Sequence, residues 1–365
     1  MKIAEITLTN FRTYQKQFLT LHDGVHLLVG ENGAGKTNFL EAVYVLGLAR
    51  SYKGEDQDLI RHEEAFTKIE ALVKSDSREK TMAIIVSELG KKAMVGGSEI
   101  RRLSDYIGLL DIVAFTPDSL QLVKGSPVER RYFLDLFLGQ SDKAYMNALA
   151  SFKHVLKQRN ELLKSFALTK KYDELFLDVL DNQFETAAFQ IVAKRAAFLK
   201  EVAVYADQAF AVLTGRQNEL TLQYRPSVES DFKTSLQGRL KSDLNQGATG
   251  LGPHRDDFDI LLQGKSAKDF ASQGEQRLCV LALTLAMVDY LDQKTKEMPV
   301  LLLDDVFSEL DHEKQNRLVR HLNRLGAQVV ITTTSLSDLA PQAISGARRY
   351  TVTKGRIRED LTHGN

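Results

Sequence analysis

One eight-residue segment limits the possible folds of this chain more than any other feature. Residues 30–37 read Gly-Glu-Asn-Gly-Ala-Gly-Lys-Thr, which matches the phosphate-binding pattern G-x-x-x-x-G-K-[ST]. The short apolar stretch Val25–Val29 leads into this segment, and apolar residues at helical spacing follow it from Phe39 to Leu48. A strand, a glycine-rich loop and a helix in that order predict the start of an α/β domain.

The residue types in the loop suit a bound nucleoside triphosphate. Its glycines let backbone N–H groups curl around phosphate oxygens, and the helix that follows points its positive N-terminus at them. Lys36 is placed to reach the β- and γ-phosphates, and Thr37 is placed to ligate Mg²⁺. We therefore expect ATP, with Mg²⁺, at a site formed by Gly30, Glu31, Asn32, Gly33, Ala34, Gly35, Lys36 and Thr37.

A second apolar strand carries the acids that a phosphate-binding loop requires. Val300–Leu303 runs directly into Asp304 and Asp305. We expect Asp304 to hold Mg²⁺ alongside Thr37, which leaves Asp305 to orient or polarise the water that attacks the γ-phosphate. A strand that ends in polar residues is common by itself. Because the chain also has the phosphate-binding loop at residues 30–37, the two acids are better interpreted as part of the same site. The predicted catalytic residues are Asp305 and Lys36.

A third motif precedes this acidic strand. Residues 272–277 read Ser-Gln-Gly-Glu-Gln-Arg and lead into an apolar helix that extends to about Leu291. Ser272 stands where a helix N-cap belongs, and Gly274 permits a phosphate to approach the backbone closely. As a lone hexapeptide it would be an ordinary capped helix start. In this context it predicts a second phosphate-binding element made of Ser272, Gln273, Gly274 and Glu275.

Length and hydrophobic spacing predict two lobes. The chain has 365 residues, more than one core usually organises, and a 43% hydrophobic content that is ample for packing. Residues 128–213 contain no proline and carry apolar residues at helical spacing, which favours a helical hairpin or small bundle. Alternating stretches between residues 68 and 86 predict an antiparallel sheet beside the first strand and helix. We expect an ATPase head, residues 1–115 and 245–365, with a helical arm, residues 116–244, inserted in it.

Composition limits the partners and the compartment. Lys and Arg number 48, as do Asp and Glu, so no general positive field attracts nucleic acid, and any DNA contact must use a local patch. The single cysteine, Cys279, lies in an apolar run and is expected to be a buried thiol. The first residues alternate like a strand, and no stretch approaches 18 uninterrupted apolar residues. We expect a cytoplasmic protein with no membrane contact.

The order of these motifs identifies the ABC/SMC ATPase superfamily. Residues 272–277 resemble its signature motif, which meets the γ-phosphate bound to the other subunit, and Ser308–Asp311 resembles the D-loop, which lies along the same interface. Within the superfamily the chain resembles the RecF family over nearly its whole length. The segments that carry this resemblance are Leu8–Tyr14, Gly30–Thr37, Phe115–Asp118, Leu122–Pro127, Leu251–Asp257 and Leu302–Asp311.

The resemblance implies a fold and a role. The fold is an ABC/SMC-type ATPase head, a P-loop core plus an antiparallel sheet, with an inserted helical lobe. RecF-like proteins act with RecO and RecR at gapped DNA, where they help RecA to replace single-strand-binding protein. An ATP-dependent homodimer is then expected to hold duplex, gapped or junction DNA, with Ser308 and Asp311 at the dimer interface. Slow, DNA-stimulated ATP hydrolysis serves as a timer, without chemistry on the DNA.

Several assignments stay open at the level of sequence. Many ABC ATPases have a switch histidine after the last core strand, but this chain has threonines at 332–334, of which we choose Thr333. A Q-loop glutamine near Thr116–Asp118 is not evident, and His254 and Arg255 have no assigned role. The candidate DNA contacts, each of which is as well interpreted as a solvated charge, are Lys53, Arg61, Arg101, Arg102, Arg130 and Arg131.

Three other functions share the loop. A small-molecule kinase would use residues 30–37 but would not explain the motifs at 272–277 and 308–311. An SMC-like DNA-organising protein needs long coiled-coil arms, and a P-loop nuclease needs an added metal-bearing domain. From this sequence we expect neither long coiled-coil arms nor an added metal-bearing domain. Dimerisation that depends on ATP would separate the RecF-like hypothesis from a kinase.

Overall fold

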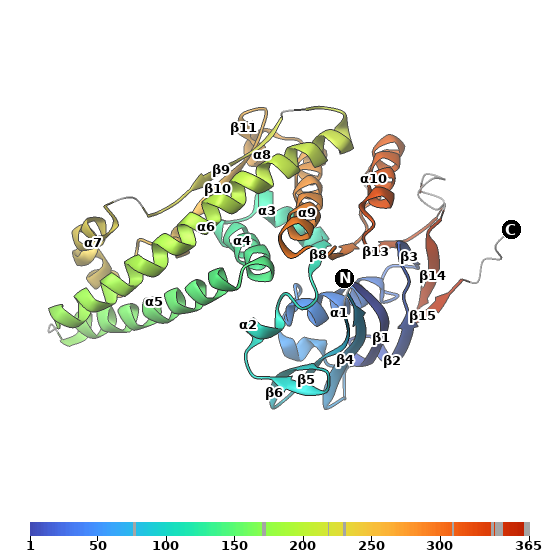
Figure 1. Ribbon diagram of the computed structural model, residues 1–365, viewed down its shortest axis with the longest axis horizontal. Coiled ribbons are helices and arrows are strands. Elements are labelled where there is room, and N and C mark those ends of the chain that lie inside the picture. The colour runs from blue at the N-terminus through green and yellow to red at the C-terminus, as the bar shows by residue number, and fades with distance from the viewer. Residues whose placement is uncertain are drawn as a thin grey trace. The chain divides into compact units, whose positions relative to one another are not determined.

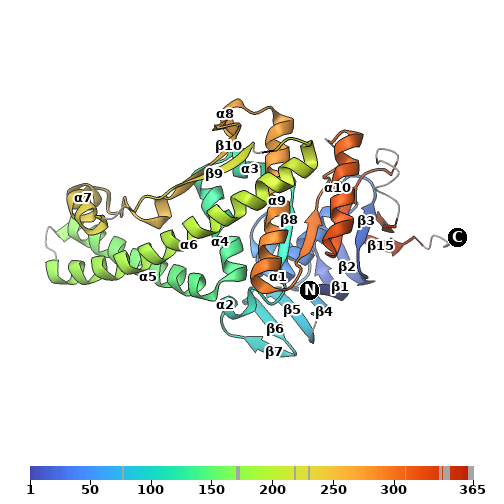
Figure 2. The ribbon, with the colours of Figure 1, turned by 45° about the horizontal axis from the view of Figure 1, so that its top comes forward.

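The computed structural model describes residues 1–75, 78–169, 173–217, 219–228, 231–308, 310–336, 339 and 346–360, and Figures 1 and 2 show its ribbon. The chain forms two compact units. The first, here called the head unit, contains Met1–Leu120, Tyr205–Gln217 and Ser272–Asn365. The second, here called the arm unit, contains Gln121–Val204 and Asn218–Ala271.

This division differs from the expected one, mainly in the second half of the chain. The expected head resumed at residue 245, whereas residues 245–271 belong to the arm unit. The reason is that strand β10 (Asp257–Leu262) pairs antiparallel with β9 (Leu220–Arg225), so one small sheet holds both. Conversely, residues 205–217, expected in the arm, belong to the head unit.

A six-stranded sheet forms the core of the head unit. Its order is β15-β14-β3-β13-β12-β8; β15 is antiparallel to β14, and the other pairs are parallel. The strands are β3 (Val25–Val29), β8 (Ile112–Phe115), β12 (Val300–Leu303), β13 (Val329–Thr333), β14 (Arg348–Thr353) and β15 (Arg356–Glu359). Every residue of β12 and β13 is buried, which is typical of central parallel strands covered on both faces. Their carboxyl ends share one edge, which is where such sheets bind ligands.

The head unit also contains an antiparallel sheet. Its order is β2-β1-β4-β5-β6-β7, and each neighbouring pair is antiparallel. The strands are β1 (Lys2–Phe11), β2 (Tyr14–Thr20), β4 (Phe66–Lys74), β5 (Glu79–Ser87), β6 (Gly90–Val95) and β7 (Ser98–Ile100). Every second residue of β4 is buried, as the alternating sequence predicts. The expected antiparallel sheet is confirmed.

Helices pack around both sheets of the head unit. Helix α1 (Lys36–Leu48) contacts β4 and β5 of the antiparallel sheet and β8 and β13 of the parallel sheet. Helix α9 (Gln273–Thr295) packs against β8, and its Cys279 is buried as expected. The remaining helices are η1 (Asp56–Leu59), α2 (Leu103–Tyr106), η2 (Pro117–Leu120) and α10 (His312–Leu325).

Helices dominate the arm unit. Helix α5 (Lys143–Thr169) and the part of α6 (Glu174–Thr214) that belongs to this unit, residues 174–204, run beside each other in Figures 1 and 2, which confirms the predicted hairpin. The unit also holds α3 (Gln121–Lys124), α4 (Pro127–Ser141), α7 (Phe232–Gln246), η3 (Pro253–Arg255), β11 (Lys265–Ser266) and α8 (Ala267–Phe270). In the part of the chain that the structure describes, no helix combines the length and apolar character that a membrane span requires.

Candidate functional site

Two glycines fix the shape of the loop between β3 and α1. A Cβ atom at Gly30 would lie 2.3 Å from the carbonyl oxygen of Val352, so a side chain there would collide with the backbone of β14. Gly35, the N-cap of α1, has a φ of +119°, which glycine adopts without strain. The buried Tyr14 hydroxyl donates to the Gly35 carbonyl oxygen at 2.8 Å. The loop is therefore preorganised for a phosphate group.

Lys36 is anchored at the mouth of this loop. Its ammonium donates to the carbonyl oxygens of Gly30 at 2.6 Å and Glu31 at 2.9 Å. Burial lowers the pKa of Lys36, and the nearby carboxylates of Asp304 and Asp305 partly oppose that shift. An ammonium with three N–H donors that uses two on the loop keeps one for a ligand oxygen.

Asp304 connects three elements at the carboxyl edge of the parallel sheet. The residue directly follows β12, and its Oδ1 accepts from the Thr37 hydroxyl of α1 at 3.1 Å. The same oxygen accepts from the Thr332 hydroxyl of β13 at 2.6 Å. A hydroxyl and a carboxylate held this closely are the hard oxygen ligands that Mg²⁺ prefers. The described residues contain no cluster of three or more His, Cys, Asp or Glu side chains that could hold a metal ion.

The backbone of Asp305 is held on both sides. Its φ of +50° lies in the left-handed region, and its N–H donates to the Thr332 hydroxyl at 2.9 Å. Its carbonyl oxygen accepts from the Arg277 guanidinium and from the Ser308 hydroxyl, each at 3.0 Å. The guanidinium of Arg277, in α9, also lies over the Phe115 ring. Sequence reasoning missed Arg277, although it stands in the motif at 272–277.

The threonine that serves this edge is Thr332 rather than Thr333. Thr332 is fully buried and joins both acids, whereas the Thr333 hydroxyl donates to the Ser335 carbonyl oxygen at 3.0 Å. Side chains alternate along a strand, so 332 and 334 share one side and 333 takes the other. The structure therefore brings Thr332, and not Thr333, to the acids, and the switch role of Thr333 stays a prediction. The alternation was readable from the sequence, but the face that meets the acids was not.

These groups line one cavity of about 350 Å³ at the sheet edge. Its walls come from the loop, both acids, β13 and two neighbouring loops: Asn32, Gly33, Gly35, Lys36, Thr37, Asn38, Lys53, Pro117, Asp304, Asp305, Thr332 and Thr334. Lys53, predicted as a DNA contact, instead faces this cavity. Burial lowers its pKa, while Glu41 and Asp304 act in the opposite direction. Its predicted contact with DNA stays a prediction.

A buried glutamate holds the turn that carries Lys53. Glu41 of α1 is completely buried and accepts from Arg12 at 3.0 and 2.8 Å. It also accepts from the Ser51 hydroxyl at 2.6 Å, and that hydroxyl in turn accepts from the N–H groups of Lys53 and Gly54. A network of charged groups that are hydrogen-bonded to one another is rigid, so it holds the turn that carries Lys53 in one position. No local pattern of residues indicates this link in advance.

The motif at 272–277 forms the capped start of α9. The Ser272 hydroxyl accepts from the Glu275 N–H at 3.3 Å, and the Glu275 carboxylate accepts from the Ser272 N–H at 3.1 Å. This capping box lowers the pKa of Glu275, with Arg216 at 3.4 Å adding to the effect. Among described residues, no atom lies within 4 Å of a Cβ built at Gly274. The space beside Gly274 is therefore open toward the rest of the described chain.

The D-loop residues lie between the acids and α10. Ser308 bonds back to Asp305, and Asp311 caps α10 by accepting from the Lys314 N–H at 2.8 Å. Both are exposed in the single chain, and Glu309 lies outside the described residues. Their predicted place at a dimer interface stays a prediction.

The arginines predicted to contact DNA separate into two groups. Arg130 is committed to Asp257 through two bonds of 2.6 and 3.0 Å, and Arg131 donates to the Asp256 carbonyl oxygen at 2.8 Å. These bonds stabilise the arm unit, so we correct both to structural residues. Arg61 donates to a backbone carbonyl at 2.8 Å, while Arg101 and Arg102 are exposed. The latter three stay candidates.

The segment Gly252–Asp257 is hydrogen-bonded to several other segments of the arm unit. The Asp256 carboxylate is completely buried and accepts from the Arg195 guanidinium, the Tyr224 hydroxyl and the Ser227 N–H. His254 Nε2 lies 2.9 Å from the Thr249 carbonyl oxygen. This arrangement accounts for Asp256 and His254, and leaves Arg255 exposed.

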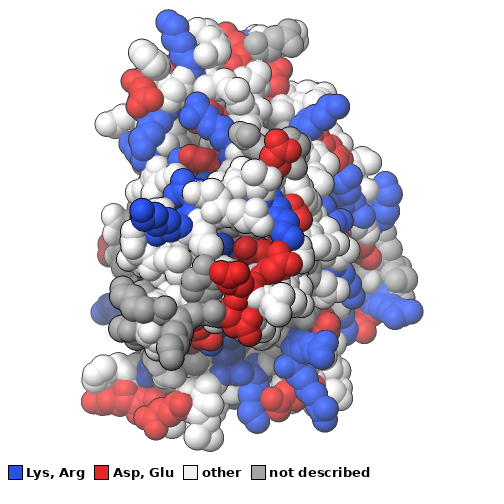
Figure 3. Space-filling model, turned by 90° about the vertical axis from the view of Figure 1, so that its left-hand side faces the viewer, with Lys and Arg blue, Asp and Glu red and all other residues white. Residues whose placement is uncertain are grey.

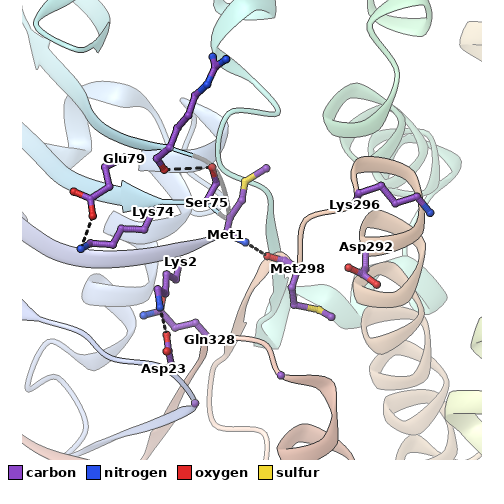
Figure 4. Close-up of a pocket in the computed structure, with 13 residues that line it drawn as sticks. Met1, Lys2, Asp23, Lys74, Ser75, Glu79, Asp292, Lys296, Met298 and Gln328 are labelled. Carbon is purple, nitrogen blue, oxygen red and sulfur yellow. Dashed lines mark hydrogen bonds and ion pairs between the residues drawn. The ribbon is translucent and has the colours of Figure 1, made fainter.

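A larger cavity, of about 750 Å³, lies elsewhere in the head unit and is drawn in Figure 4. Gly24, Met298 and Gln328 in its wall stand just before β3, β12 and β13, so it opens at the amino ends of the parallel strands. Four cationic side chains line it: Lys2 and Lys74 are paired, with Asp23 at 2.7 Å and Glu79 at 2.6 Å, and the other two are Arg78 and Lys296. It therefore lies at the edge of the parallel sheet opposite the one that carries residues 30–37.

Comparison with known proteins gives one consistent family. The family model described as RecF/RecN/SMC N terminal domain matches residues 2–352. The DNA replication and repair protein RecF of Lactobacillus johnsonii is 36% identical over 370 residues, covering 98% of this chain and 99% of its own length. RecF of Geobacillus kaustophilus is 37% identical over 369 residues, covering 98% and 99%.

Solved structures agree with the sequence relatives. A structure of the recombination mediator protein RecF-ATPrS in the RecFOR pathway has a TM-score of 0.89 and 30% identity, with 99% of this chain and 98% of that chain covered. An Smc head domain from Pyrococcus furiosus has a TM-score of 0.55 at 19% identity, covering 98% of this chain and 95% of that chain, which supports the fold alone. The predicted ABC/SMC-type head is confirmed.

Proposed function

Because the chain belongs to the RecF family of DNA replication and repair proteins, we propose that it is an ATP-dependent DNA-binding protein of recombinational repair. ATP, with Mg²⁺, binds the loop at 30–37 and pairs the protein with a second copy. The dimer holds duplex, gapped or junction DNA until hydrolysis reopens it. Together with RecR and RecO it promotes RecA loading at single-strand gaps, in the cytoplasm.

The observation that carries the proposal is the meeting of three strand ends in one cavity. Lys36 and Thr37 come from the loop after β3, Asp304 and Asp305 from the end of β12, and Thr332 from β13. A RecF structure with ATP that is 30% identical over 98% of this chain adds support. A cationic ligand, a hydroxyl and two acids in this order are what phosphoryl transfer to water requires.

Each residue has a separate task in that reaction. Lys36 neutralises charge on the terminal phosphates, and Thr37 with Asp304 would hold Mg²⁺, which would offset negative charge on the phosphates when bound. Asp305 orients the attacking water, and Thr332 keeps both acids in place. The protein therefore contributes positioning and electrostatics rather than a covalent intermediate.

The start of α9 explains why the site would need a second copy. Ser272 is exposed, and the space around Gly274 is open within the described chain. A helix start with no side chain at its second residue is suited to a phosphate brought by another molecule. ATP held by one copy would thus be closed in by Ser272–Glu275 of the other, with Ser308 and Asp311 alongside.

Charge distribution bears on how DNA is held. The face drawn in Figure 3 has basic and acidic side chains interspersed, with acidic ones gathered near its middle. With a net charge of zero, binding then depends on a local patch, completed when two copies combine. Hydrolysis would be slow and DNA-stimulated, so that ATP acts as a timer.

Size-exclusion chromatography with and without ATP, repeated with gapped duplex DNA, tests the proposal. We expect a monomer without nucleotide, a dimer with ATP and a shifted dimer–DNA complex with both. A protein that stays monomeric with ATP and DNA would contradict it, and so would a monomer that phosphorylates a small molecule.

A further inference from the structure

One face of α10 carries a row of arginines in the head unit. The opposite face is buried against the protein through Gln315, Leu318, Val319 and Leu322. Arg317, Arg320 and Arg324 follow at spacings of three and four residues, which places them on one side of a helix. We propose that this row binds the phosphate backbone of duplex DNA. The inference rests on the DNA-binding function proposed above and names the surface that carries it.

The row borders a hollow of about 370 Å³. Its lining consists of Val212 from the end of α6 and five residues of α10: Glu313, Arg317, Arg320, His321 and Arg324. Gly215, just after α6, has a φ of +80°, and a Cβ atom there would lie 2.6 Å from the Arg317 guanidinium. The glycine therefore makes room for this arginine at the rim of the hollow.

The three arginines of this row differ in their partners. Arg317 forms an ion pair with Glu313 at 2.6 Å. Arg320 donates its Nε–H to a backbone carbonyl at 3.2 Å, and both Arg320 and Arg324 are exposed. Neither pairs with a carboxylate among the residues that the structure describes. In a chain of zero net charge, this is a local excess of positive charge.

The hollow keeps this charge over the neutral pH range. Burial lowers the pKa of His321, and the neighbouring Arg324 lowers it further. The imidazole is therefore neutral near pH 7, and the arginines, which do not titrate, supply the charge.

The spacing of the row suits a polymer of phosphates. Seven residues of α-helix rise about 10.5 Å, from Arg317 to Arg324. Duplex DNA of that length carries roughly six phosphates, since it has one per 1.7 Å of axis. Each planar guanidinium can take two oxygens of one phosphate. A single small anion would need converging, buried cations, whereas Arg320 and Arg324 are exposed and follow one another along the helix.

The same helix is tied to the hydrolytic acids. The Gln315 side chain donates to the carbonyl oxygens of Phe307 at 3.2 Å and Leu310 at 3.1 Å, and Asp311 caps the helix. Ser308, in the same turn, bonds to the Asp305 carbonyl oxygen. A shift of α10 would therefore also move the turn whose Ser308 hydroxyl bonds to the Asp305 carbonyl oxygen. DNA bound along the arginine row is therefore placed to alter ATP hydrolysis.

The test compares two double variants that each remove two positive charges from the full chain. Arg320→Gln/Arg324→Gln removes the unpaired part of the row, and Arg356→Gln/Arg358→Gln, on the exposed side of β15, is the matched control. Binding of a fluorescent duplex is measured with ATP across a salt series, with a poly-glutamate peptide as a second ligand. We expect the first variant to bind DNA about tenfold more weakly and its log–log salt slope to fall by about 0.9 for each phosphate that is no longer neutralised, with the control unchanged.

The outcomes separate the inference from the function on which it rests. If the wild type binds duplex DNA and the Arg320/Arg324 variant matches it in affinity and slope, the row does not bind DNA. Equally weak binding by the β15 control would also overturn the assignment, because it would reflect net charge alone. A variant that keeps DNA binding but no longer binds poly-glutamate would point to an acidic protein partner instead. A wild type that fails to bind DNA with ATP would overturn the proposed function itself.

Discussion

The hydroxyl of Thr332 is the most informative single group in the nucleotide site. It donates to Asp304 Oδ1 at 2.6 Å and accepts from the Asp305 N–H at 2.9 Å, within a completely buried side chain. Thr332→Val keeps the shape and removes both bonds. Thr333→Val is the matched control, because its hydroxyl makes one bond, to the Ser335 carbonyl oxygen, outside the acidic pair.

The cost of Thr332→Val follows from the two bonds. A hydrogen bond to a charged acceptor contributes about 1.5 to 3 kcal/mol, and a buried N–H left without a partner costs about 1 to 3 kcal/mol. We expect the free energy of unfolding to fall by about 3 kcal/mol in Thr332→Val and by about 1 kcal/mol in the control. The Asp305 N–H also holds a residue with a φ of +50°, so hydrolysis should fall as well.

Urea denaturation followed by circular dichroism measures the first effect, and the Mg²⁺ dependence of ATP binding and hydrolysis measures the second. A Thr332→Val protein that is as stable as Thr333→Val and hydrolyses ATP at the wild-type rate would refute both roles of the hydroxyl. A decrease confined to stability would keep the packing role and remove the catalytic one.

Three further changes test other parts of the site. Lys36→Met should abolish ATP binding. The far-UV circular dichroism should stay unchanged, because the Lys36 ammonium bonds only to carbonyl oxygens of the phosphate-binding loop among the described residues. Normal ATP affinity by titration calorimetry would show that Lys36 does not bind phosphate. Asp305→Asn should bind ATP and Mg²⁺ but stall hydrolysis, so that the dimer persists on DNA in a filter-binding chase; wild-type turnover would contradict this. Burial raises the pKa of Asp111 from 3.8 to about 7, so the folded state binds a proton that the unfolded state releases, and stability falls as pH rises toward 8. Between pH 5 and pH 8 the wild type should lose about 2 to 3 kcal/mol relative to Asp111→Asn in urea denaturation, and parallel pH profiles would rule out the shift.

Local patterns predicted the head unit well. The loop at 30–37, the apolar strand before Asp304 and the helix after Ser272 each depend on neighbouring residues, so their spacing was sufficient. The same holds for β4, whose alternating residues are alternately buried. Family resemblance then supplied the ABC/SMC-type fold and the expected dimer, which spacing alone did not.

Contacts between distant segments were not predictable in this way. The boundary of the arm unit was misplaced because β9 and β10 pair across more than thirty residues of intervening helix and loop. Arg130 and Arg131 resemble surface charges in the sequence, whereas in the fold they bond to the Asp257 carboxylate and the Asp256 backbone. A basic residue in a sequence does not reveal which carboxylate or carbonyl it meets.

Two copies are proposed to share each ATP, and one variant tests this sharing most directly. Ser272→Arg puts a long cationic side chain where the partner's ATP would lie, while the P-loop of the same chain is unchanged. We measure ATP-dependent dimerisation by sedimentation velocity, together with ATP affinity. We predict near-normal affinity, no ATP-induced dimer and little hydrolysis.

A mixture of Ser272→Arg with Lys36→Met supplies the internal control in the same sedimentation experiment. It should form at most one composite site per heterodimer, from the P-loop of the first variant and residues 272–275 of the second. Recovery of a heterodimer with ATP, where neither variant dimerises alone, is the predicted result. A Ser272→Arg protein that still dimerises by itself with ATP would contradict the shared site.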